Sequence, residues 1–198
     1  MCDCVSNGSQ LCAWLPIRGD LSTTVDSDLL EILHLLHSLP QTQPSDLLSS
    51  AEVQWNTKKL YTLELKLNRI AEEQDPYQTL LRHAAHVYTS RALRNLPKGS
   101  VVVSQLQQKL AHSLNRLRNA KALRHVSAAR LLTILWALLL AQRPHEDGSC
   151  LGCDLWSVYI LWMLEKLRII DYEMLLSRLK CIAWVDGFKE VELRSLFS

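Results

Sequence analysis

The chain has 198 residues, of which 48% are hydrophobic, so it can bury a core and is not disordered throughout. It contains only six glycines and six prolines, a composition that favours long helices over a strand-and-turn fold. The net charge of +2 conceals three blocks: residues 1–75 carry −6, residues 76–145 carry +11 with no acidic residue, and residues 146–198 carry −3. The basic block is therefore either neutralised by the acidic flanks or available to an anionic partner.

Residues 1–25 show no clear hydrophobic period, and we expect them to form a flexible arm before a single helical domain over residues 26–198. Their apolar run is broken by Pro16 and Arg18, unlike that of a secretory signal. The six cysteines are therefore expected to be reduced, in the cytoplasm or the nucleus.

A first helix is expected over residues 29–39, with Asp28 as its cap and Pro40 directly after its end. This helix is apolar on most faces. It must therefore be surrounded by other helices of the chain, or it docks into a groove of another protein.

The segment from residue 46 to residue 75 permits two interpretations. Leu63 and Leu67 are four residues apart and belong to a helical repeat. The same two leucines, together with Tyr61 and Leu65, also alternate with polar residues, which is the pattern of a half-buried strand. Leucine, glutamate and lysine predominate, which favours the helix. Another helix is expected over residues 77–96.

Residues 101–142 are expected to be the central segment of the fold. Their first half predicts a helix with an apolar stripe bordered by basic residues, and residues 131–141 are almost wholly apolar. Only 12 uncharged residues lie between Arg130 and Arg143, about 18 Å of helix at ~1.5 Å per residue, whereas a bilayer core needs about 30 Å. The apolar half is therefore expected inside the protein and not across a membrane. The pattern leaves open whether one helix or two cover the segment.

Half of a zinc motif lies in the loop that follows. Cys150 and Cys153 have the Cys-x-x-Cys spacing, and His145 is a third candidate ligand. A fourth ligand would have to come from the N-terminal cysteines. Two reduced thiols in a loop are thus the simpler interpretation, zinc is the first alternative, and a redox-active dithiol is the second.

After the loop, an apolar helix over residues 155–170 is expected to pair with residues 131–141 as an antiparallel hairpin. A helix over residues 172–185 follows. Asp186-Gly187 then joins either two helices or the strands of a β-hairpin over residues 181–193. The predicted class is all-α, a multi-helix bundle around a central apolar hairpin; the alternative adds a small C-terminal β-hairpin.

The sequence contains no glycine-rich phosphate loop, no His-Glu-x-x-His and no Gly-x-Ser-x-Gly, so we expect no enzyme. Six tryptophans are many for this length, and tryptophan is favoured as an interface anchor. The favoured function is a non-enzymatic helical interaction protein, a regulatory or adaptor subunit that binds another protein or a second copy of itself.

The alternative function is binding of RNA or DNA phosphates by the acid-free basic segment 76–145. The candidate residues for a partner or for phosphate are Lys109, Arg116, Arg118, Lys121 and Arg124. This interpretation requires that Arg116, Arg118 and Arg124 are not all held by carboxylates of the same chain.

Overall fold

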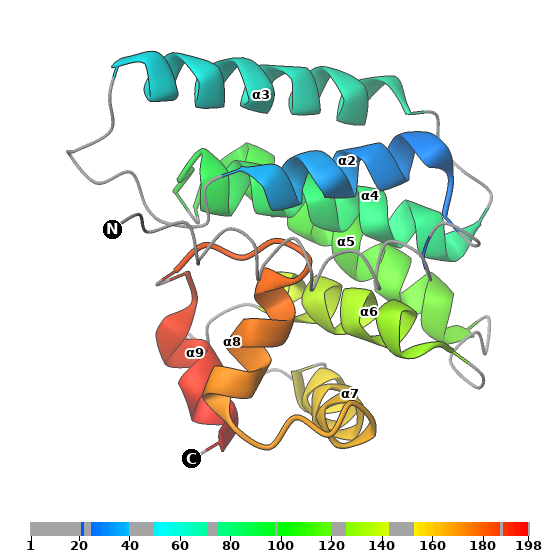
Figure 1. Cartoon of the computed structure of the whole chain (residues 1–198). Helices are drawn as coiled ribbons and strands as arrows, with labels where there is room; N and C mark the ends of the chain where they lie inside the picture. The colour runs from blue at the N-terminus through cyan, green and yellow to red at the C-terminus, as the bar shows by residue number, and fades with distance from the viewer. Residues whose placement is uncertain are drawn as a thin grey trace, which may run out of the picture.

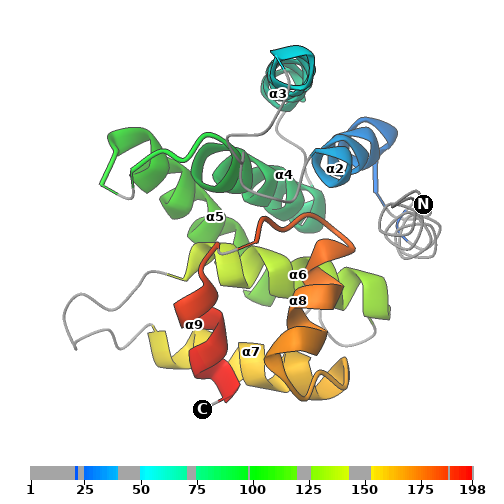
Figure 2. The ribbon, with the colours of Figure 1, turned by 60° about the vertical axis from the view of Figure 1, so that its left-hand side comes forward.

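In a computed structural model of the chain, the apolar run at residues 131–140 lies within helix α6 (Ala128–Ala141), and every one of its side chains is buried. The Ser127 hydroxyl caps this helix by accepting a hydrogen bond from the Arg130 N–H at 3.3 Å. The central segment is therefore two helices, the first being α5 (Val101–Asn119). Figures 1 and 2 both show α6 between the layer that contains α4 (Pro76–Tyr88) and the helix α7 (Cys153–Lys166).

The structure describes residues 21, 25–39, 50–70, 75–97, 99–119, 126–142, 153–186 and 188–197. In these residues it has eight α-helices, one π-helical turn and one 3-10 turn (Ser195–Phe197), and no strand. The predicted all-α class is confirmed, and the alternative with a C-terminal β-hairpin is wrong. None of the described helices is long and apolar enough to cross a membrane.

Helix α2 (Ser27–Ser38) is capped by Asp26 and not by Asp28, because the Asp26 carboxylate accepts the Asp28 N–H at 2.8 Å. Its leucines pack against α3 and α4, as expected for a helix that is apolar on most faces. Leu21 and Val25, which fall within the predicted arm, are buried in the core.

Helix α3 (Ser50–Arg69) confirms the helical interpretation of the ambiguous segment. Leu63 and Leu67 are fully buried, whereas Tyr61 is 59% exposed and Leu65 is 39% exposed. A strand would have placed all four side chains on one face. Burial at the i, i+4 positions alone is the pattern of a helix packed on one side.

Helix α4 (Pro76–Tyr88) starts at a proline and is capped by Asp75, whose carboxylate accepts the Tyr77 N–H at 2.9 Å. The helix expected over residues 77–96 ends earlier, since a π-helical turn, Thr89–Leu93, follows α4 and Asn95 adopts a left-handed conformation with φ 50°. Helix α4 packs against both α3 and α5.

Helices α6 and α7 pack together and run in opposite directions in Figure 2, as expected of the central hairpin. The helix expected over residues 155–170 ends at Lys166 because Arg168 is left-handed, with φ 54°. The Ile169 N–H then donates to the Leu164 carbonyl at 2.8 Å, which closes the helix C-terminus.

Helix α8 (Tyr172–Lys180) stops five residues before the predicted end at residue 185. The four apolar residues from Ile182 to Val185 are consecutive and all buried, which neither a helix nor a strand on the surface of a core could achieve. Trp136 fixes this non-helical segment, since its indole N–H donates to the Ala183 carbonyl at 3.0 Å. A short helix, α9 (Glu190–Arg194), ends the C-terminal region together with the 3-10 turn.

Candidate functional site

The predicted basic residues do not form a single ridge. Lys109 and Arg116 are exposed on α5, two turns apart on the same face. Arg118 is half-buried on the other flank, with its guanidinium carbon 5.8 Å from the centre of the Trp156 ring of α7. Lys121 and Arg124 lie outside the described residues.

The predicted metal ligands are not brought together by anything that the structure describes. His145 and Cys150 lie outside the described residues, and Cys153 is described only as the first residue of α7. Among the described residues, no group of three His, Cys, Asp or Glu side chains could hold a metal ion. Zinc at His145, Cys150 and Cys153 stays a prediction, which metal analysis of protein purified without added zinc would test.

A cavity of about 350 Å³ lies between α3, α4, the π-helical turn and α5. We call it the basic cavity because its described lining includes four basic side chains, three from α4 and one from α5: Arg82, His83, His86 and Lys109. Thr89 of the turn and Asn68 of α3 also line it. Only Lys109 belongs to the residues predicted from the sequence. The others from α4 and the turn come from the same acid-free segment, 76–145.

Two of these side chains have buried polar atoms without a hydrogen-bond partner. They are the Nε and Nη1 atoms of Arg82 and the Oγ1 atom of Thr89. An unpaired buried donor costs about 1–3 kcal/mol, so most buried polar groups of proteins are paired. Arg82 and Thr89 thus place three unpaired donor atoms at one cavity, whereas Arg91 and Arg130, outside its described lining, have one such atom each.

The only acidic side chain in the described lining is already neutralised. Glu64 receives two hydrogen bonds from Arg94, from Nε at 2.8 Å and from Nη2 at 2.7 Å. In this bidentate pair a carboxylate of the acidic block 1–75 neutralises a residue of the basic block 76–145, as the charge pattern allowed. The pair includes only one arginine of the basic block. No ion pair within the described residues joins a carboxylate to Arg82 or Lys109, so the cavity keeps a positive charge.

The pKa of His86 is lowered by its surroundings in the cavity. Burial is the main cause that lowers its pKa to about 4, and electrostatic repulsion by Arg82, His83 and Lys109 lowers it further, while a hydrogen bond with the backbone of Leu67 acts in the opposite direction. His86 is therefore neutral at pH 7 and adds no charge to the cavity.

His83 forms a histidine–serine pair with Ser113 of α5, since its Nδ1 atom lies 2.7 Å from the Ser113 hydroxyl. Such a pair can activate a serine nucleophile. Here Ser113 is 1% exposed, and its hydroxyl also donates to the Lys109 carbonyl at 3.1 Å. The serine is thus inaccessible to a substrate, and the pair joins α4 to α5.

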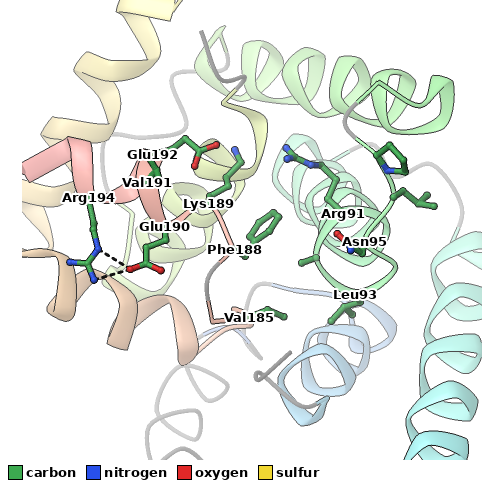
Figure 3. Close-up of a pocket in the computed structure, with 13 residues that line it drawn as sticks. Arg91, Leu93, Asn95, Val185, Phe188, Lys189, Glu190, Val191, Glu192 and Arg194 are labelled. Atoms are coloured by element: carbon green, nitrogen blue, oxygen red, sulfur yellow. Dashed lines mark hydrogen bonds and ion pairs between the residues drawn. The ribbon is translucent and has the colours of Figure 1, made fainter. Parts of the chain in front are cut away.

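A second cavity, of about 790 Å³, lies between the π-helical turn and the C-terminal segment (Figure 3). Its charged groups are mostly engaged within the chain. Glu190 binds Arg194 at 2.9 Å, and Arg91 lies over the Phe188 ring, 5.6 Å from its centre. The Lys189 amine is buried and donates hydrogen bonds to main-chain carbonyls at the end of α6. Its distance to the Gln142 carbonyl oxygen is 2.7 Å. Arg91 has one buried Nη1 atom without a hydrogen-bond partner, against two such atoms of Arg82, so this cavity offers fewer unused donors than the basic cavity.

One signal of the basic cavity is present in the sequence. Arg82 and His86 are four residues apart on a predicted helix, and both precede the chosen candidates within the same acid-free block. The prediction fell on α5 because its basic residues border an apolar stripe. Comparisons of the chain with protein-family models, with curated proteins and with solved structures find no match.

Proposed function

We propose that this chain is a non-enzymatic helical interaction protein, regulatory or adaptor in role, that binds an anionic segment of a partner protein at the basic cavity. The observation that supports the proposal is the unpaired guanidinium of Arg82, next to Lys109, in a cavity whose carboxylate is already bound to Arg94. Arginine is well suited to bind an incoming carboxylate or phosphate.

A binding role without catalysis agrees with the neighbouring groups. Of the described groups around the cavity, the carboxylate is held by Arg94 and the serine that contacts His83 is buried. Neither is positioned as a general base or a nucleophile that a substrate could reach.

Nucleic-acid binding is the second candidate, and the exposed positions of Lys109 and Arg116 on α5 favour it. Such binding would depend on the outer face of α5 and not on the interior of the cavity. Arg118, which would extend this face, lies instead beside Trp156. The two candidates therefore predict different sensitive residues.

The test is a titration of the full chain with polyglutamate, with a generic RNA and with duplex DNA, at 50 and 200 mM salt. We expect polyglutamate to bind at 50 mM and to weaken at 200 mM, because salt screens the charges. Substitution of both Arg82 and Lys109 by glutamine should weaken binding at least tenfold. The control variant, with Lys166 and Arg178 changed to glutamine, loses the same charge from exposed positions elsewhere and should bind like the unmodified chain.

Absence of polyglutamate binding at 50 mM salt would refute the proposal. Binding of RNA or DNA that is lost in Arg116→Gln but kept in Arg82→Gln would favour the nucleic-acid function. Equal losses in the double variant and its control would show that only the total charge matters and would refute the assignment of the cavity.

A further inference from the structure

The basic cavity has more unused donors than a carboxylate can satisfy. Arg82 contributes two buried N–H groups without partners, and Thr89, a residue that is 3% exposed, contributes a buried hydroxyl that is also unpaired. The ammonium group of Lys109 adds up to three N–H donors from an exposed position, and Asn68 adds an amide. A carboxylate brings two oxygens, whereas a phosphate monoester brings three terminal oxygens that are strong acceptors.

The charge of the cavity points to the same kind of ligand. With Glu64 bound to Arg94 and His86 neutral, Arg82 and Lys109 leave two formal positive charges. A carboxylate carries one negative charge, whereas a phosphate monoester carries about 1.5 to 2 at pH 7. The dianion therefore matches both the charge and the number of donors.

We propose that the basic cavity binds the phosphate of a phosphorylated serine or threonine side chain on the partner protein. This inference rests on the proposed function, and it makes partner binding conditional on phosphorylation. The buried N–H groups of Arg82 and the hydroxyl of Thr89 donate to the terminal oxygens of the phosphate. Lys109, which is exposed, neutralises the remaining charge from the solvent side.

A nucleic-acid backbone fits this cavity poorly. A phosphodiester has one charge and two free oxygens, and it continues into the chain on both sides, so it cannot enter a cavity end-on. Apart from the two imidazoles, the described lining has no aromatic side chain on which a base could stack. A volume of about 350 Å³ is also at the small end of ligand sites, which suits a single modified side chain.

Thr89 provides a variant that separates ligand binding from folding. Valine has nearly the same shape as threonine but has no hydroxyl, and the Thr89 hydroxyl has no partner to lose. Thr89→Val should therefore keep or raise the Tm of the free protein while it weakens phosphate binding at least fivefold. A residue with a purely structural role would lower both.

The experiment measures binding of the full chain to three degenerate peptide libraries by fluorescence anisotropy. One library has a central phosphoserine or phosphothreonine, the second has unmodified serine or threonine, and the third has glutamate at that position. We expect the phosphorylated library to bind at least tenfold more tightly than the glutamate library. Arg82→Gln, Lys109→Gln and Thr89→Val should each remove part of this preference, and the Lys166/Arg178 control should keep it.

The possible failures are distinguishable. Equal binding of the phosphorylated and glutamate libraries would overturn this inference and leave the proposed function in place. No binding of either library would overturn both. A preference for phosphate that survives in all three variants would overturn the assignment to this cavity, as would tighter binding of a 5′-phosphorylated oligonucleotide or of vesicles with phosphoinositide headgroups. Because Lys109 is exposed and Thr89→Val is isosteric, the test stands even if Arg82→Gln fails to fold.

Discussion

Substitution of Lys189 by methionine tests how the central helix is closed at its C-terminal end. Helix α6 has no basic residue in its own last turn. The Lys189 amine reaches it from 47 to 50 residues further along the chain and donates to the carbonyls of Leu139 and Gln142, with Leu140 at 3.5 Å. These are the carbonyls that the last turn of a helix leaves without partners, and a positive charge there also complements the helix dipole.

The expected effect is large because the site is buried. Lys189 is 7% exposed, so solvent cannot replace the lost donors. A hydrogen bond from a charged group contributes about 1.5–3 kcal/mol, and the charge at the helix end adds about 0.3–1 kcal/mol. Methionine keeps most of the aliphatic stem, so Lys189→Met should lower the free energy of unfolding by about 2–4 kcal/mol.

Urea denaturation at pH 7, followed by far-UV circular dichroism, measures this loss. In thermal unfolding it corresponds to a fall in Tm of roughly 4–16 °C for a chain of this size, at about 2–4 °C per kcal/mol. Lys166→Met is the control, since Lys166 is exposed at the end of α7, and its free energy of unfolding should change by less than about 0.5 kcal/mol. If both variants unfold at the same urea concentration as the unmodified chain, Lys189 does not stabilise α6.

Three further predictions follow from buried polar groups. Thr89→Val should raise the free energy of unfolding by about 1 kcal/mol, because it removes an unpaired buried hydroxyl. If urea denaturation instead shows that the free energy of unfolding falls by more than about 1 kcal/mol, the hydroxyl has a partner. The hydroxyls of Tyr77 and Thr133 lie 2.7 Å apart in the core, so a double-mutant cycle of Tyr77→Phe and Thr133→Val should give a coupling of about 1 kcal/mol, and additive losses would disprove the bond. The unfolded chain binds a proton at His86 near pH 6.5 but the folded chain only near pH 4, so the free energy of unfolding should fall as the pH drops from about 6.5 towards 4. His86→Gln should make the free energy of unfolding depend less on pH. Urea denaturation of both proteins at pH 5, 6 and 7 measures this dependence, and an equal slope in the two would contradict the role of His86.

The centre of the fold could be predicted because its signal is local. An apolar run too short for a membrane must be buried in protein, and the helical class follows from composition. The break at Ser127 could not be predicted, because Val126-Ser127 is compatible with a continuous helix and with a capped one. Only the packing of α5 and α6 against α4 decides between them.

The C-terminal segment and the site depended on contacts that are distant in sequence. The run from Ile182 to Val185 is apolar like a helix or a strand, but the hydrogen bond from Trp136 to Ala183 holds it in neither form. In the basic segment, all arginines have the same charge in the sequence. Arg94 is neutralised by a glutamate 30 residues earlier, while Arg82 has no carboxylate partner among the described residues, and the sequence does not show which of the two has such a partner.

The non-helical stretch after α8 has a consequence for the order in which the protein matures on the ribosome. Helix α6 is synthesised well before the residues that complete its contacts. Ala183, which accepts the Trp136 N–H, is 47 positions after Trp136, and Lys189, which binds the last carbonyls of α6, is up to 50 positions after them. During that interval the most apolar helix of the chain has an open side. The nascent protein is therefore most prone to aggregate while residues 142–189 are being added, and nascent-chain binding by a chaperone should be strongest in that window.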